Sequence, residues 1–98
     1  MKDLSPDDRP REKLWRNGPT ALGDNELVAI VVGSGVRGAN ALGLANEILR
    51  RCGGLHGLAR AVPAELAQVD GIGQVRAAQL VAALEIGRRT MAHAPGAR

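Results

Sequence analysis

An internal repeat constrains the fold of this 98-residue chain more than any other feature. Residues 39–51 align with residues 77–89 at an offset of 38 positions, and seven of the thirteen aligned pairs are identical. The same offset also aligns two pairs of glycines, Gly33 with Gly71 and Gly35 with Gly73. Repeats of this kind are typical of supersecondary units that bury their apolar faces against each other. The sequence therefore predicts two stacked copies of one helical unit, and chance similarity between two Ala-rich helices is the alternative.

The apolar residues favour helices over sheets. Hydrophobic residues make up 45% of the chain, but Trp15 is the only aromatic one, so the core must consist of Ala, Leu, Val and Ile. Such side chains let helices pack closely, whereas sheets favour β-branched and aromatic residues. A chain of this length has room for one domain. We therefore expect a single all-α domain, and we expect Trp15 to anchor its first helix to the core rather than to stack on a base.

Prolines at first helical positions and glycines after last ones mark the ends of the predicted helices. They give a compact domain of five to six helices over residues 1–92, with an irregular segment at 1–8 and a linker or tail at 93–98. The expected helices are 10–17, 27–32 with an acidic first turn at 23–26, 39–51, 55–61, 63–69 and 74–91. In the last of them, the helical spacing places Val75, Ala78, Val81 and either Leu80 or Leu84 toward the core.

The segment Gly71-Ile72-Gly73 predicts a tight turn that exposes backbone N–H groups. Two glycines allow backbone conformations that side chains forbid, so that Ile72 can point into the core. The N–H groups then lie at the start of the last helix, where unpaired donors and the helix dipole favour an anion. Arg76 follows one turn later and adds positive charge. The turn therefore predicts a phosphate site, and a turn after a helix end with no ligand is the alternative.

This pattern resembles the helix-hairpin-helix motif of DNA repair and recombination proteins, so the repeat predicts tandem motifs related by an approximate two-fold axis. Gln74 and Val75 depart from the motif, which often has Pro and Lys after the second glycine. The candidate DNA phosphate-binding residues are Gly71, Ile72, Gly73, Gln74 and Arg76 in the second hairpin, and Gly33, Gly35 and Arg37 in the first.

The positive charge is concentrated in the later part of the chain. The net charge is only +3, but from Arg37 onward eight basic residues face four acidic ones, and all eight are Arg. Arginine suits phosphate because its planar fork of donors is permanently charged. This distribution favours DNA as the partner, and ordinary solvated surface charge is the alternative.

A competing motif lies in the first half of the chain. The apolar run 27–32 is followed by Gly33-Ser34-Gly35-Val36-Arg37-Gly38, which fits the strand and glycine-rich turn of a dinucleotide-binding fold. That fold also needs a second parallel strand and an acidic residue about 20 positions further on. Residues 52–64 contain no acidic residue and no β-rich run. The dinucleotide alternative is therefore the less favoured one.

Catalytic and metal-binding patterns are missing from the sequence. Cys52 is the only cysteine, and His56 and His93 have no carboxylate or cysteine at ligand spacing. Ser5 and Ser34 are the only serines, and neither lies in a nucleophile elbow. No apolar run reaches the roughly 18 residues of a membrane span. We expect no cofactor, no metal, no activity of the chain's own and a cytoplasmic location.

Four ordered blocks resemble the N-terminal domain of the bacterial RadC (UPF0758) family: residues 9–14, 21–30, 53–58 and 71–89. Gly23 departs from the family, which usually has Ser or Thr there in a capping box with Glu26. The resemblance implies a role in DNA repair. It also implies a following JAB/MPN-type metal-binding domain with a His-x-His and an Asp, which this sequence does not contain. The ending 94–98 suits a chain cut after the helical domain, and a naturally short protein is the alternative.

The predicted function is a non-catalytic, sequence-independent DNA-binding module that contacts phosphates through hairpin N–H groups. A protein-interaction or scaffold domain that positions the JAB/MPN domain without binding DNA is the second hypothesis. A truncated enzyme with activity in these residues is the third.

Overall fold

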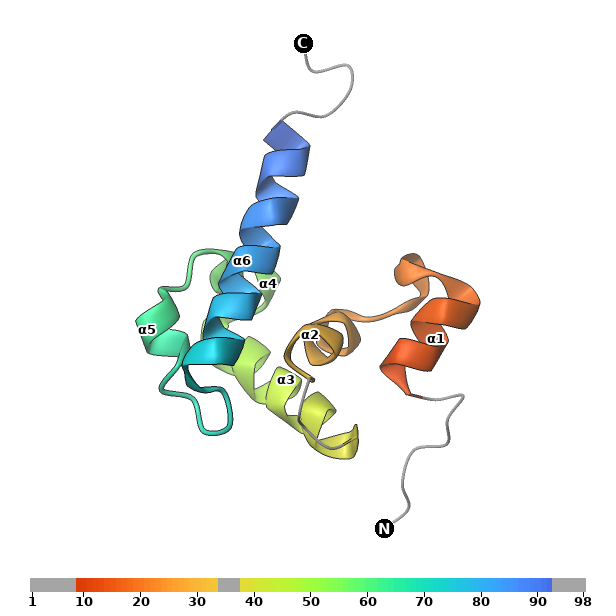
Figure 1. Cartoon of the computed structure of the whole chain (residues 1–98), viewed down its shortest axis with the longest axis horizontal. Helices are drawn as coiled ribbons and strands as arrows, with labels where there is room; N and C mark the ends of the chain where they lie inside the picture. The colour runs from red at the N-terminus through yellow and green to blue at the C-terminus, as the bar shows by residue number, and fades with distance from the viewer. Residues whose placement is uncertain (1–8, 34–37, 93–98) are drawn as a thin grey trace.

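The computed structural model describes residues 9–33 and 38–92, and within them the chain is helical without a strand (Figure 1). Six α-helices and one 3-10 turn follow in order: α1 (Pro10–Asn17), η2 (Pro19–Ala21), α2 (Asp24–Val32), α3 (Gly38–Cys52), α4 (Leu55–Ala59), α5 (Pro63–Leu66) and α6 (Gly73–Ala92). The predicted all-α fold is confirmed. The expected irregular segment 1–8 and linker 93–98 lie outside the described residues.

The sequence signals explain most helix ends. Pro10 and Pro63 each occupy a first turn, where a missing N–H costs nothing. After α3, the N–H groups of Gly53 and Gly54 both donate to the carbonyl of Leu49 at 2.9 Å, and both glycines have positive φ. This glycine pair ends α3 and redirects the chain into α4.

Helix α5 is shorter than the predicted range 63–69. The N–H of Gln68 donates to Glu65 O, and the N–H of Val69 donates to Leu66 O at 3.1 Å. These bonds span three residues instead of four, so the chain tightens before it reaches Gly71. Apolar periodicity alone does not distinguish this tight turn from another turn of α-helix.

The core is built from small aliphatic side chains of α2 to α6 and the turn before α6. Its buried residues are Val28, Ala29, Val32, Ala45, Ile48, Leu58, Leu66, Val69, Ile72, Ala77 and Leu80. The predicted strand of the dinucleotide alternative is wrong, because residues 27–32 belong to α2, which packs against both α3 and α6. Burial on two sides explains why this run is apolar throughout.

The prediction for the core face of α6 is partly wrong. Val75 is 72% exposed and Ala78 is exposed, whereas Ala77 and Leu80 are buried. The rotation of the helix is set by Ile72, which precedes α6 and is only 2% exposed. Positions about one and two turns after Ile72 therefore face the core, and the positions between them do not.

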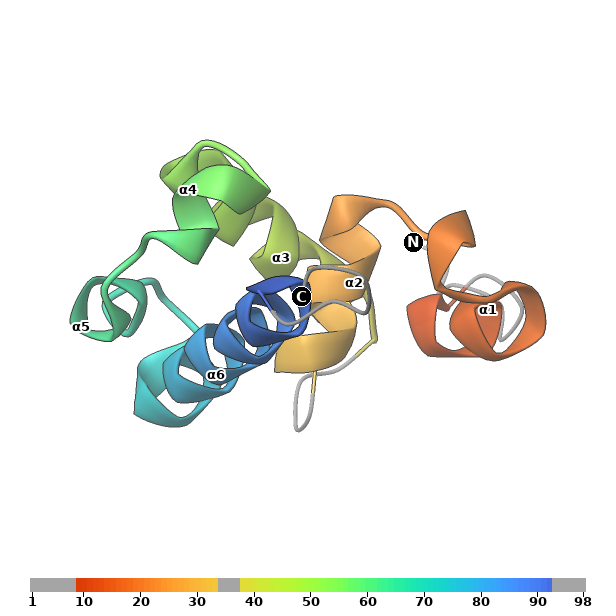
Figure 2. The ribbon, with the colours of Figure 1, turned by 90° about the horizontal axis from the view of Figure 1, so that it is seen from above.

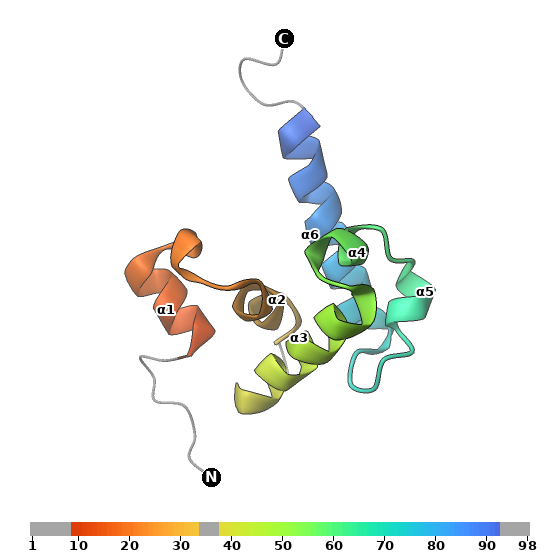
Figure 3. The same cartoon turned by 180° about the vertical axis from the view of Figure 1, so that it is seen from behind.

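Trp15 does not anchor α1 to the core, so that prediction is wrong. Its side chain is 85% exposed, and α1 contributes no buried residue. In all three views α1 lies at the edge of the molecule beside α2 (Figures 1, 2 and 3). Helix α1 packs mainly against α2 and η2, and its half-buried residues include Lys13 and Leu14.

The close approach of α4 to the end of α3 gives a test of the packing. A Cβ added to Gly57 would overlap the carbonyl of Cys52, whereas one added to Gly43, exposed on α3, would meet nothing within 4 Å. Gly57→Ala should lower the free energy of unfolding by about 1–3 kcal/mol, because the backbone must shift. Gly43→Ala should instead raise it by about 0.5–1 kcal/mol, because alanine favours helix. Urea denaturation of both variants measures the difference, and equal effects would contradict the packing.

Candidate nucleic-acid interface

The turn before α6 has the geometry that its glycines predict. Gly71 and Gly73 have φ values of 91° and 67°, in the left-handed region that side chains disfavour. The N–H of Ile72 donates to the carbonyl of Val69 at 3.0 Å, and the Ile72 side chain is buried. We call residues 71–73 the α6 turn. Its shape follows from the sequence, whereas its ligand stays a prediction.

One side of the α6 turn packs against the protein and the other is open. A Cβ at Gly71 would come within 3.2 Å of the Leu44 side chain on α3, whereas a Cβ at Gly73 would meet nothing within 4 Å. Helix α6 is 20 residues long, and the first N–H groups of an α-helix have no partner within it. Gln74 and Val75 beside them are exposed. The positive end of α6 is therefore accessible to an anion.

Arg76 connects the α6 turn to α2. Its Nε donates to the carbonyl of Val32 at 2.9 Å, and its Nη1 donates to the carbonyl of Gly71 at 3.3 Å. A cation at the last carbonyl of α2 is also favoured by that helix's dipole. This structural role has no signal in the sequence, since the repeat aligns Arg76 with Gly38. Contact of Arg76 with a phosphate stays a prediction.

The first predicted hairpin is described only in part. Gly33 follows α2 with φ −73° and ψ −10°, unlike Gly71, with which the repeat aligns it. A Cβ at Gly33 would lie 2.6 Å from the carbonyl oxygen of Ala29, so close approach favours glycine there. Gly35 and Arg37 lie outside the described residues. The tandem, two-fold arrangement of hairpins therefore stays a prediction.

The repeat is visible in two clusters of charge on α3 and α6. Each has one glutamate that accepts hydrogen bonds from arginines three and four residues later. Glu47 contacts Arg50 and Arg51, both at 2.7 Å, and Glu85 contacts Arg88 at 2.7 Å and Arg89 at 2.9 Å. These arginine hydrogen bonds, led by those from Arg50 and Arg88, lower the pKa of each glutamate to about 2. Four arginines of the basic excess are thus held in pairs on two carboxylates.

The two repeats differ in burial although their charges match. Ile48 in the α3 copy is fully buried, whereas the aligned Ile86 in α6 is 64% exposed. Figure 1 shows why, because the second half of α6 extends away from the other helices. The α3 copy thus supplies core residues that the α6 copy does not.

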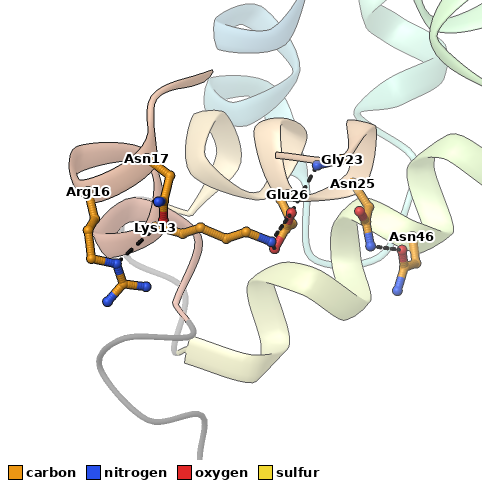
Figure 4. Close-up of polar contacts among 7 residues, drawn as sticks. All are labelled: Lys13, Arg16, Asn17, Gly23, Asn25, Glu26 and Asn46. Carbon is orange, nitrogen blue, oxygen red and sulfur yellow. Dashed lines mark hydrogen bonds and ion pairs between the residues drawn. The ribbon is translucent and has the colours of Figure 1, made fainter. Parts of the chain in front are cut away.

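A polar network joins α1, α2 and α3 (Figure 4). The Lys13 ammonium contacts the Glu26 carboxylate at 3.2 Å, and the N–H of Gly23 donates to Glu26 Oε1 at 2.9 Å. The Gly23 hydrogen bond is the main cause that lowers the pKa of Glu26. Asn25 donates to Asn46 at 3.0 Å and joins α2 to α3. The glutamate half of the capping box is therefore formed, although Gly23 has no side chain that could accept the reciprocal hydrogen bond.

Chemically reactive groups do not gather in the described part of the chain. No three His, Cys, Asp or Glu side chains among the described residues are placed to hold a metal ion. Burial raises the pKa of the Cys52 thiol, which disfavours the reactive thiolate. Among residues 9–33 and 38–92 no helix is long and apolar enough to cross a membrane.

Comparison with known proteins identifies relatives over nearly the whole chain. The family model described as UPF0758 N-terminal matches residues 1–78. UPF0758 proteins of Methylibium petroleiphilum and of a Roseiflexus species are each 50% identical, over 92 and 91 residues or 94% and 93% of this chain. One of Clostridium novyi is 42% identical over 94 residues, or 96% of this chain. The chain spans only 41%, 39% and 41% of these three relatives. No solved structure matches it.

The two arginine-paired glutamates predict a loss of helix in acid. The pKa of each glutamate in the folded chain, about 2, lies below the ordinary value of 4.5. Their contribution to the stability of the folded chain is therefore fully present above pH 4.5. It is lost as the pH falls from 4.5 toward 2. Helical circular dichroism should therefore decrease over this range at low salt. The decrease should be smaller in a Glu47→Gln/Glu85→Gln variant, and identical acid profiles for the two proteins would contradict the pairing.

Proposed function

The chain belongs to the UPF0758 N-terminal family, and we propose that it is a non-catalytic, sequence-independent DNA-binding module. In this proposal the α6 turn and the first N–H groups of α6 hold a phosphate of the DNA backbone. One observation carries the proposal: Ile72 is buried while Gly73, one residue later, faces open space at the start of a long helix. This arrangement leaves backbone donors accessible without a side chain in front of them.

Phosphate suits this site better than a base does. Glycine backbone and the positive end of a helix attract an oxyanion but distinguish no base edge. The Arg76 charge lies within one turn and is fixed by its hydrogen bonds to Val32 and Gly71. Gly33, Gly35 and Arg37 would hold a second phosphate in the hairpin predicted from the repeat, although Gly33 does not share the positive φ of Gly71. Contacts of this type position a protein on DNA and favour every sequence alike.

Binding should be weak and only moderately sensitive to salt. Two to four neutralised phosphates give a slope of log K against log salt of roughly −2 to −4. Non-specific dissociation constants are typically on the order of 10⁻⁴ to 10⁻⁶ M, and this chain should lie at the weaker end. Gln74 and Val75 add no charge, and the exposed Asp70 next to the turn repels phosphate.

Within a longer protein the module would hold another domain near DNA. The relatives are more than twice as long as this chain, and the family resemblance implies a JAB/MPN-type metal-binding domain in the rest. We propose that the helical module holds that domain near DNA in repair, in the cytoplasm, and supplies no catalytic residue itself. Isolated chain should therefore bind DNA without cleaving it.

A specific observation also favours a second candidate function, the docking of another domain. A hollow between α4 and α6 is lined mainly by the apolar residues Leu58, Ala59, Ala61, Val81 and Leu84. Further along α6, Met91 is 76% exposed. In this role the domain would position the rest of the protein without touching DNA.

A matched pair of glycine variants tests the phosphate site. Gly73 and Gly53 both have positive φ, and a Cβ at either would meet nothing within 4 Å. Alanine should cost each about 1–2 kcal/mol of stability through backbone strain. Only Gly73→Ala should also weaken DNA binding, about threefold or more, because its methyl group occupies the space of the phosphate. Fluorescence polarisation with a labelled duplex measures this, and equal affinities for the two variants would contradict the site.

Adding a lysine at the α6 turn should strengthen binding. Val75 is 72% exposed, so Val75→Lys leaves the core intact and places an ammonium beside the expected phosphate. The salt slope should become steeper by about 0.9, which corresponds to one more phosphate contact. Ile86→Lys makes the same charge change at a position 64% exposed and about 16 Å further along α6. If both lysines steepen the slope equally, binding is diffuse and not centred on the turn.

A further inference from the structure

Among residues 9–33 and 38–92, Trp15 is the most exposed large apolar side chain, with 85% of its surface accessible. It is also the only aromatic residue of the chain. An exposed tryptophan gains nothing from folding, because its ring stays in water. Its helix nevertheless packs against α2, where the Lys13 ammonium contacts the Glu26 carboxylate at 3.2 Å and Leu14 is half-buried. The ring is therefore carried on a helix that is attached to α2 while the ring itself stays in solvent.

Exposed arginines lie near Trp15 on α1 and at its N-cap. Arg11 precedes Trp15 by four residues, so the two residues lie on the same face of α1. Arg11 is exposed, and so is Arg9 at the start of the helix. The acidic residue of α1, Glu12, is half-buried, and its Oε1 is enclosed. The exposed residues of α1 and its N-cap thus include one aromatic ring together with guanidinium groups.

Other occupants fit this surface less well. A protein partner needs a contiguous apolar patch, on the order of a few hundred Å². The exposed positions of α1, however, are Arg11, Trp15, Arg16 and Asn17, of which only Trp15 is apolar. A membrane-surface helix needs a whole apolar face, which this short helix lacks. A base attached to phosphates supplies both a flat partner for the ring and negative charge for the arginines.

We propose that Trp15 is a stacking platform for an unpaired nucleobase, with Arg9 and Arg11 holding the adjoining phosphates of a single strand. The proposal rests on the DNA-binding function above and extends it. The α6 turn binds phosphates of any DNA, whereas Trp15 adds affinity only where bases are unstacked. The chain then prefers single-stranded or frayed DNA over intact duplex.

Variants at position 15 separate stacking from other roles. Trp15→Leu keeps an apolar side chain without a π face, and Trp15→Phe keeps a smaller π face. Neither threatens the fold, because the side chain has no buried contact to lose. The probes are oligodeoxythymidylate of about 12 nucleotides, within the length that one domain covers, and a duplex of the same length. The fluorescence of wild-type Trp15 reports base contact directly, since no other residue of the chain contributes.

Single-stranded oligonucleotide should quench Trp15 fluorescence to saturation. Trp15→Leu should bind it about five- to tenfold more weakly than wild type, Trp15→Phe should recover most of the loss, and duplex affinity should not change. Equal single-strand affinities for wild type and Trp15→Leu would overturn the proposal. A spectral shift with anionic phosphatidylglycerol vesicles but not with the oligonucleotide would overturn it in favour of a lipid surface.

The Gly73→Ala variant distinguishes failure of the stacking proposal from failure of the proposed DNA-binding function. If only the stacking proposal is wrong, Gly73→Ala still weakens binding of both DNA forms and position 15 has no effect. If wild type binds neither form, the DNA-binding function is wrong and the stacking proposal is overturned with it.

Discussion

The burial of Ile72 is the contact on which the rest of this structure depends. Positive φ at Gly71 and Gly73 turns the chain so that Ile72 enters the core, and α6 begins at the next residue. The rotation of α6 then follows, with Leu80 two turns later in the core. The same rotation directs Arg76 to the last carbonyl of α2. One apolar side chain thus fixes the start of α6, its rotation and its connection to the other helices.

The number of arginines overstates the positive charge that the chain offers to phosphate. Arg50, Arg51, Arg88 and Arg89 are paired with two glutamates, and Arg76 donates to backbone carbonyls. Each glutamate cluster keeps a net charge of +1 on an exposed helix surface, where salt screens it. The proposed interface therefore depends on backbone donors and a helix dipole more than on a dense basic patch. Weak, sequence-independent binding is what such an interface supports.

The sequence predicts features that depend on local chain properties. Helix ends follow from prolines and glycines, and the α6 turn follows from two glycines around an apolar residue. The aligned glutamate-arginine clusters were also implicit in the repeat. Local sequence patterns do not predict features that depend on which helices pack against each other. Trp15 is exposed because α1 lies at the edge of the molecule, and the Val32 partner of Arg76 lies 44 residues away. The rotation of α6, which exposes Val75, is likewise set by tertiary packing.

Binding of phosphate at the N-terminus of α6 can be followed by the amide chemical shifts of the labelled chain while a short duplex is added. We expect the largest shifts at the backbone N–H groups of residues 71–76, and we expect added salt to reverse them. Shifts confined to the α4–α6 hollow around Ala59 and Val81, or no shifts at any DNA concentration, would contradict this binding.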